Sequence, residues 1–185
     1  MPDAELKDLK EKMEKVIEHL RKELHGVRTG RAHPALVEDI KVDYYGAQTP
    51  ISQLASVSIP DARQILISPW DKTSIKSVEK AIQASPLGIN PQVDGDNIRL
   101  TIPELTGERR VELSKLVKKH AEDARVAVRN LRREGNDAYK KQQKNGDISE
   151  DQMHDYLEKV QELTDEYIEK IDKIAETKEK EILED

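Results

Sequence analysis

Hydrophobic residues recur at intervals of three and four in three long stretches of the chain. In the longest stretch, from about residue 106 to 144, they fall on one side of a helix with about 3.6 residues per turn. These residues are Leu113, Leu116, Val117, Ala121, Ala124, Val128, Leu131 and Ala138. Residues 4–28 repeat the pattern and predict another helix, for which Gly30 is the stop signal. A capping box at Ser149–Gln152 marks the start of a third helix. Three helices with one apolar stripe each predict a bundle in which the stripes face one another.

Between the first two helices the pattern changes to the two-residue period of strands. The segments with this strand pattern are 40–45, 55–59, 65–67 and 98–102. Residues 73–84 predict one short helix, and residues 45–50 have the composition of a turn. We expect the single tryptophan, Trp70, to lie in the core of this small unit.

The two patterns together predict an α+β protein with two domains. An elongated three-helix bundle takes residues 1–30 plus 105–185, and a small, β-rich α/β domain of residues 31–104 is inserted between its first two helices. The chain passes between the domains twice, at about 30–31 and 104–105. Two thin connections at one end of a bundle predict a hinge and a bent, two-armed molecule. The predicted hinge residues are Gly30, Arg31, Glu104 and Leu105.

Composition supports the helical prediction and shows an uneven distribution of charge. Charged residues make up 37% of the chain and aromatic residues 3%, which is typical of long helices. The net charge is −6, but residues 107–144 carry six surplus positive charges and residues 147–185 ten surplus negative ones. Cysteine is absent, and no apolar run approaches the length of a signal core or a membrane span. We therefore expect a soluble, cytoplasmic protein.

Four arginines of the second helix share one face. Arg125, Arg129, Arg132 and Arg133 fall within an arc of about 100°, turned roughly 140° away from the apolar stripe. A solvated helix face is the ordinary explanation for such a group. However, arginine suits bidentate binding of phosphate, and like charges stand four residues apart where acidic partners would be expected. The pattern modestly favours RNA or another phosphate-bearing partner, and we call these four residues the arginine ridge.

The sequence gives no positive support for an enzyme. The five histidines lack the paired spacing of a zinc site, and no phosphate-binding GxxxxGK[ST] loop is present. Carboxylates are abundant, but nothing marks one pair for acid–base chemistry. We expect no metal and no cofactor.

Several segments, taken together, closely resemble the bacterial ribosome recycling factor family over essentially the whole chain. They are VRTGRAHPALVEDIKVDYYGAQTPISQLASVSIP, LGINP, IRLTIPELTGERR, RVAVRNLRRE and KVQELTDEYIEKID. The resemblance implies a three-helix bundle flexibly linked to a small α/β domain. It also implies a monomeric factor that acts with elongation factor G and GTP to split the post-termination ribosome into subunits, releasing tRNA and mRNA.

The resemblance further implies where the ribosome is contacted. The bundle would lie on RNA of the large ribosomal subunit, whereas the smaller domain and the hinge would face elongation factor G. The expected RNA-binding residues, with Arg132 first among them, are Arg132, Arg129, Arg133, Arg125, Arg28, Arg31, Arg110 and Arg109. Three positions depart from the family pattern: Pro86, Gly107 and Gly135, the last of which costs a helix about 1 kcal/mol against Ala.

Two other classes of function remain open at this stage. A helical protein–protein adaptor would recognise its partner through the acidic third helix, with the arginine ridge serving only to balance its charge. A hydrolase with an unrecognised site is the weaker alternative.

Overall fold

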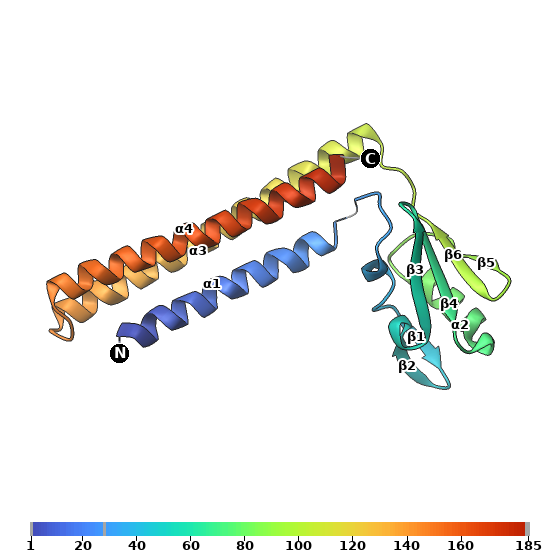
Figure 1. Ribbon diagram of the computed structural model, residues 1–185, viewed down its shortest axis with the longest axis horizontal. Coiled ribbons are helices and arrows are strands. Elements are labelled where there is room, and N and C mark those ends of the chain that lie inside the picture. The colour runs from blue at the N-terminus through green and yellow to red at the C-terminus, as the bar shows by residue number, and fades with distance from the viewer. Residues whose placement is uncertain (1, 28, 184–185) are drawn as a thin grey trace. The chain divides into compact units, whose positions relative to one another are not determined.

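The computed structural model describes residues 2–27 and 29–183, which form two compact units (Figure 1). Unit 1 comprises Met1–Thr29 and Gly107–Asp185, and unit 2 comprises Gly30–Thr106. In the described residues, unit 1 is helical and unit 2 contains the strands. The α+β class and the insertion of a β-rich unit between two helices therefore agree with the prediction.

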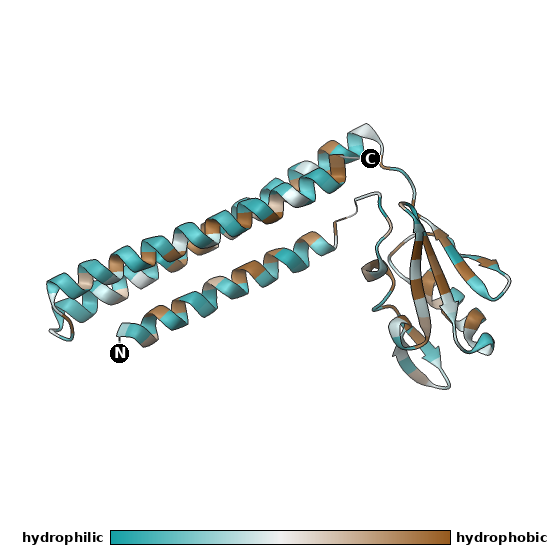
Figure 2. Ribbon diagram, viewed as in Figure 1, coloured by the Kyte–Doolittle hydropathy of each residue, from teal (hydrophilic) through white to brown (hydrophobic). Residues whose placement is uncertain are grey.

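Unit 1 is built from α1 (Pro2–His25), α3 (Gly107–Lys144) and α4 (Glu150–Leu183). Hydrophobic residues recur along helices whose remaining positions are hydrophilic (Figure 2). The buried residues of α3 are Leu113, Val117, Ala121, Ala124, Val128, Gly135 and Tyr139. Leu116, which the periodic pattern placed in the stripe, is exposed instead. The capping box of α4 is confirmed, because the Ser149 side chain accepts a hydrogen bond from the backbone N–H of Gln152 at 3.1 Å, and the Gln152 side chain accepts one from the backbone N–H of Ser149 at 2.9 Å.

The first helix is shorter than its hydrophobic pattern predicted. It ends at His25 rather than at residue 28, directly before Gly26. The N–H of Val27 turns back to the carbonyl of Leu24 at 3.1 Å, which closes the last turn. Glycine favours such an ending because a helical backbone costs it more conformational entropy than it costs other residues.

A glycine inside α3 has a packing role that the sequence did not reveal. Gly135 is buried, and a Cβ built on it would lie 2.9 Å from Cδ2 of Leu9 and 3.6 Å from Cγ1 of Val160. These two side chains belong to α1 and α4. The missing side chain therefore makes room for both neighbouring helices at one level of the core.

Two tyrosines of α4, eleven residues apart in the sequence, make the same kind of hydrogen bond to α1. Tyr156 donates its hydroxyl to Asp3, and Tyr167 donates to Glu14, both at 2.6 Å. The lysine three residues after each tyrosine lies over its ring, Lys159 at 5.0 Å and Lys170 at 4.4 Å from the centroid. The equal spacing on both helices shows that α1 and α4 run parallel.

Unit 2 contains two antiparallel sheets and one α-helix, α2 (Ile75–Ala84). The two-stranded sheet pairs β1 (Lys41–Tyr44) with β2 (Ala47–Pro50). The second sheet has the order β3-β4-β6-β5 and consists of β3 (Ala55–Asp61), β4 (Gln64–Pro69), β5 (Gln92–Asp94) and β6 (Asn97–Thr101). The prediction missed β5, and it read the residues of β2 as part of a turn.

The prediction that Trp70 lies in the core is wrong, since 68% of its surface is exposed. Odd-numbered residues of β4 point into the core, and buried Pro69 is the last of them. The next position faces outward, so the alternation itself places the tryptophan ring at the surface. The core of unit 2 is aliphatic and includes Val42, Ile51, Ile65, Ile67, Val78, Ile82, Ile98 and Leu100.

All four predicted hinge residues lie in unit 2, where its two ends meet. Gly30 is buried with a φ of +76°, and a Cβ on it would lie 3.1 Å from Cγ of Leu105. The Arg63 guanidinium lies 3.7 Å from the carboxylate of Glu104. The incoming and outgoing segments are therefore packed side by side, and glycine satisfies both the backbone geometry and the close approach.

Candidate nucleic-acid interface

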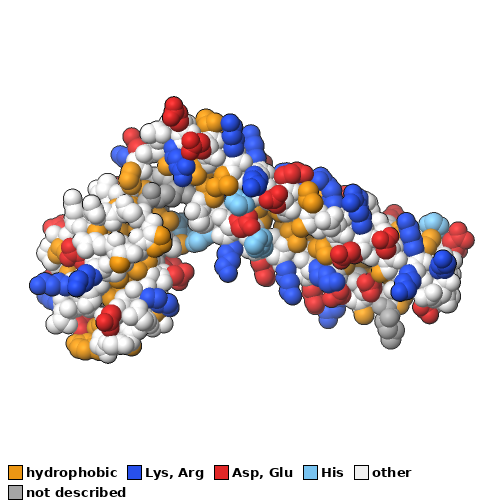
Figure 3. Space-filling view, turned by 180° about the vertical axis from the view of Figure 1, so that it is seen from behind, with side chains coloured by type: hydrophobic (Ala, Val, Ile, Leu, Met, Phe, Trp, Pro, Cys, Tyr) orange, Lys and Arg blue, Asp and Glu red, His pale blue; other side chains and the backbone are white. Residues whose placement is uncertain are grey.

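The whole arginine ridge lies on α3, as the helical period predicted. Arg125, Arg129 and Arg132 are partly buried, while Arg133 is exposed. On the face of unit 1 drawn in Figure 3, basic side chains are interspersed with acidic ones. What distinguishes the four arginines is therefore the set of partners that each one has.

Arg125 is held by two carboxylates. Its Nε and one terminal nitrogen lie 2.8 Å from Oδ1 of Asp172 on α4, and its other terminal nitrogen donates to Oε2 of Glu122 at 3.1 Å. Burial disfavours the charged guanidinium, but the bonds with Asp172 and Glu122 outweigh burial and raise the pKa of Arg125. With all three nitrogens engaged, this residue joins α3 to α4.

Arg129 shares one of these carboxylates. A terminal nitrogen of Arg129 lies 3.4 Å from Oε1 of Glu122, so the two oxygens of Glu122 contact two different arginines. The expectation that acidic partners are missing is thus wrong for Arg125 and Arg129. We call these two arginines the held half of the ridge.

Arg132 and Arg133 form the other half of the ridge. Within residues 2–27 and 29–183, neither makes an ion pair or a hydrogen bond through its side chain. Their guanidinium groups are therefore available to an anion from outside the chain. We call these two residues the open half of the ridge.

Two other predicted RNA-binding arginines, Arg109 and Arg110, lie near the start of α3. Arg109 pairs with Glu112 at 2.9 Å, and Arg110 donates to the carbonyl of Leu183 at 3.4 Å. At 1.5 Å of rise per residue, Arg110 and Arg132 are about 33 Å apart along α3. Arg31 is exposed in unit 2, and Arg28 lies outside the described residues. The predicted arginines at the start of α3 and those of the ridge therefore do not share one pocket.

Comparison with known proteins finds the same family over nearly the entire chain. The family model described as ribosome recycling factor matches residues 20–183. The chain belongs to the ribosome recycling factor family. It is 54% identical to the ribosome-recycling factor of Bacillus licheniformis, and the alignment covers 97% of both chains. The function is accordingly that of a ribosome recycling factor, and the adaptor alternative is not favoured.

Solved structures agree with this assignment. A solution structure of the ribosome recycling factor shares 46% of its sequence with this chain, with a TM-score of 0.82 and coverage of 98% of this chain and 97% of that one. A second structure contains the T. thermophilus ribosome recycling factor and the E. coli elongation factor G bound to the E. coli post-termination complex. The matched chain of that structure is 44% identical to this chain, with a TM-score of 0.69, and the match covers 99% of both chains.

The sequence prediction missed the two carboxylates that contact the arginine ridge, Glu122 and Asp172. Glu122 lies three residues before Arg125 and seven before Arg129, a spacing that places it on the same helix face. That signal was present in the sequence. Asp172 comes from α4, and no local pattern could have paired it with an arginine 47 residues away.

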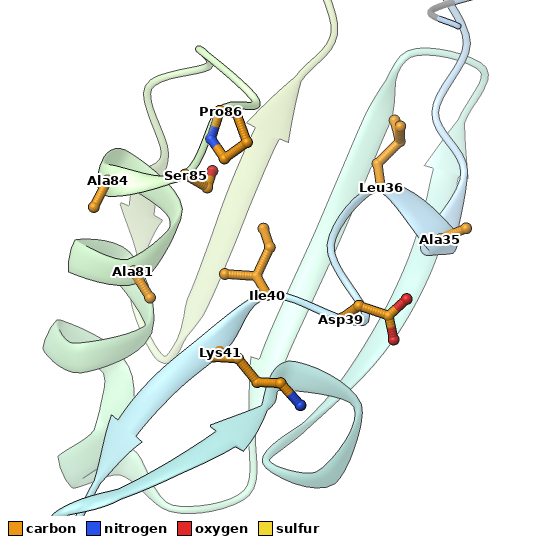
Figure 4. A pocket seen from close by; sticks show the side chains of 9 residues that line it. All are labelled: Ala35, Leu36, Asp39, Ile40, Lys41, Ala81, Ala84, Ser85 and Pro86. Atoms are coloured by element: carbon orange, nitrogen blue, oxygen red, sulfur yellow. The ribbon is translucent and has the colours of Figure 1, made fainter. Parts of the chain in front are cut away.

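Unit 2 has a pocket of about 460 Å³ between α2 and the segment leading into β1. Figure 4 shows Ala81, Ala84 and Ser85 on one side and Ile40 and Lys41 on the other. The remaining lining residues are Ala35, Leu36, Asp39 and Pro86. Pro86, which departs from the family pattern, therefore contributes to the pocket wall. The hydroxyl of Ser85 donates to the carbonyl of Ile82 at 2.6 Å.

Two histidines of unit 1 contact the same carboxylate. Glu23 of α1 contacts both His19, one turn earlier, and His120 of α3. In the part of the chain that the structure describes, no group of three or more metal-ligating side chains is placed to hold an ion. Nor is any described helix both long and apolar enough to cross a membrane.

Proposed function

We propose that the protein binds the post-termination ribosome and, with elongation factor G and GTP, promotes its splitting into subunits and the release of tRNA and mRNA. The family assignment over residues 20–183 is the observation that supports this function most strongly. The 44%-identical relative bound with elongation factor G to a post-termination complex supports the choice of partners. We further propose that the factor acts as a cytoplasmic monomer.

The proposed interface with the ribosome is the arginine ridge, and its open half makes the principal contacts. Among the described residues, Arg132 and Arg133 have no carboxylate to give up before they bind a phosphate, so we expect their full charge to be available to RNA of the large subunit. Arginine's planar fork can bind a phosphate through two parallel hydrogen bonds. Since proteins recognise folded RNA mainly by shape and by backbone contacts, a row of arginines on a rigid helix fits this task.

The remaining predicted arginines extend the proposed footprint. Arg109 and Arg110 would contact RNA near the start of α3, and Arg28 and Arg31 near the connection between the units. We propose that this connection acts as a hinge and that unit 2 faces elongation factor G. Nucleotide hydrolysis would belong to elongation factor G, so the chain itself needs no catalytic group.

Binding of isolated large ribosomal subunits tests the interface. We expect Arg132→Ala to weaken binding by roughly tenfold, which corresponds to about 1.4 kcal/mol. The slope of log K against log salt should become shallower by about one unit, because one phosphate contact is lost. Arg21→Ala, at an exposed arginine of α1, is the matched control. Unchanged affinity and slope for Arg132→Ala, with an unchanged circular dichroism spectrum, would refute the interface.

Breakdown of polysomes tests the function itself. The reaction contains post-termination polysomes, the full chain, elongation factor G and GTP, and each component is omitted in turn. We expect splitting only in the complete mixture. Splitting that proceeds equally well without the chain, or without elongation factor G, would contradict the proposal.

A further inference from the structure

The carboxylate of Glu122 bridges two arginines of the ridge. Its Oε2 lies 3.1 Å from a terminal nitrogen of Arg125, and its Oε1 lies 3.4 Å from a terminal nitrogen of Arg129. Two anionic oxygens on one centre, each facing a different guanidinium, reproduce the contacts that a backbone phosphate makes. In their absence, two like charges one helical turn apart would repel each other.

The two arginines depend on Glu122 to different degrees. Arg125 keeps two contacts with Asp172 if Glu122 leaves, and 25% of its side chain is exposed. Arg129 has only the 3.4 Å contact with Glu122 among the described residues, and 41% of its side chain is exposed. The Glu122 side chain is 54% exposed. Ion pairs this open to water are weak, so an external phosphate can displace the carboxylate.

We propose that Glu122 is a built-in competitor for RNA phosphate and that it sets the selectivity of the arginine ridge. The inference rests on the proposed function. In the free protein, Glu122 and Asp172 together neutralise the held half, so a random RNA can engage only Arg132 and Arg133. An RNA that presents phosphates along the whole ridge displaces Glu122 and also engages Arg129. The carboxylate of Glu122 thus lowers the affinity for unrelated RNA more than it lowers the affinity for RNA of the large ribosomal subunit.

The matched pair Glu122→Gln and Glu134→Gln tests this selectivity. Both positions are exposed on α3 and both changes remove one negative charge, but Glu134 makes no ion pair with the ridge arginines among the described residues. Each variant is titrated with an unrelated RNA duplex and with isolated large ribosomal subunits across a range of salt concentrations.

For the duplex, we expect Glu122→Gln to bind three- to tenfold more tightly than wild type, with a salt slope steeper by about one unit because one further phosphate contact forms. The gain in affinity for large subunits should be smaller, so the ratio of the affinity for large subunits to the affinity for the duplex should fall. Glu134→Gln should leave both the slope and the ratio close to wild type. Equal behaviour of the two variants, or weaker duplex binding by Glu122→Gln, would overturn the proposal.

The double variant Glu122→Gln/Arg129→Ala identifies the arginine that is released. We expect the gain from Glu122→Gln to disappear when Arg129 is absent. A gain that persists would show that Glu122 acts through general charge, and this would also overturn the proposal. The proposed function would fail in a different way: wild type would not bind large subunits, or Arg132→Ala would bind them as well as wild type does.

Discussion

Replacing Gly135 by alanine separates two physical effects that usually act together in a helix. On propensity alone, Gly135→Ala should stabilise α3 by up to about 1 kcal/mol. The structure predicts the opposite sign. The new methyl carbon would lie 2.9 Å from Cδ2 of Leu9, whereas carbon atoms in contact prefer about 3.5–4.0 Å.

The size of the effect follows from that distance. Leu9 must move by at least roughly 0.6 Å to reach an ordinary contact. It is only 5% exposed, and Val160 lies 3.6 Å from the same methyl position, so the displaced atoms have little room. Overpacking of a core costs about 1–3 kcal/mol, which exceeds the propensity gain. We expect a net loss of about 1 kcal/mol in the free energy of unfolding, within a range of roughly 0–2 kcal/mol.

Urea denaturation followed by circular dichroism measures this loss. Gly107→Ala is the control, because no atom of the described residues lies within 4 Å of its Cβ position and it belongs to the same helix. The control should be neutral or slightly stabilising. In a Leu9→Ala background, Gly135→Ala should become stabilising because the obstacle is gone and part of the cavity is filled. Stabilisation by Gly135→Ala in the wild-type background would refute the packing argument.

Three further predictions concern hydrogen bonding, pH and the connection between the units. Tyr167→Phe, which loses the bond to Glu14, should lower the free energy of unfolding by about 1–2 kcal/mol in urea; no change would mean that the bond contributes nothing. Burial raises the pKa of Tyr139 to about 12, so the unfolded chain releases this proton near pH 10 while the folded chain keeps it. Stability should therefore fall as the pH rises from about 10 towards 12, and a fall of the same size in Tyr139→Phe would contradict this cause. Gly30→Ala should destabilise unit 2 by about 1–2 kcal/mol in thermal unfolding, since φ is +76° and Leu105 is close; an unchanged melting temperature would argue against it.

The long helices could be predicted because their signal is repeated many times. In α3 the stripe continues over 38 residues, so one misplaced position such as Leu116 does not change the assignment. The capping box at Ser149 was readable because both of its hydrogen bonds join residues three apart. Local, repeated patterns of this kind predict structure correctly because they do not depend on contacts with distant residues.

Features that depend on distant parts of the chain could not be predicted. Strand β5 has three residues and no buried position, so it carries no apolar alternation, and it forms because β6 pairs with it. The reason for Gly135 lies in Leu9, on another helix. The arginine ridge was predictable only in part. Its position on α3 follows from the helical period, but the contact between Arg125 and Asp172 depends on how α3 packs against α4.

The division of the ridge nevertheless has a partly local origin. Glu122 precedes both held arginines, and an acid that precedes a base is the more favourable order on a helix. Arg133 has an acid only after it, Asp137 at i+4, and the described structure shows no pair between them. The residues three and four positions from Arg132 include no acid at all. Thus the order of charges along α3 directs Arg125 towards holding the helices together and leaves Arg132 and Arg133 for an external anion, so stability and affinity depend on different arginines of one face.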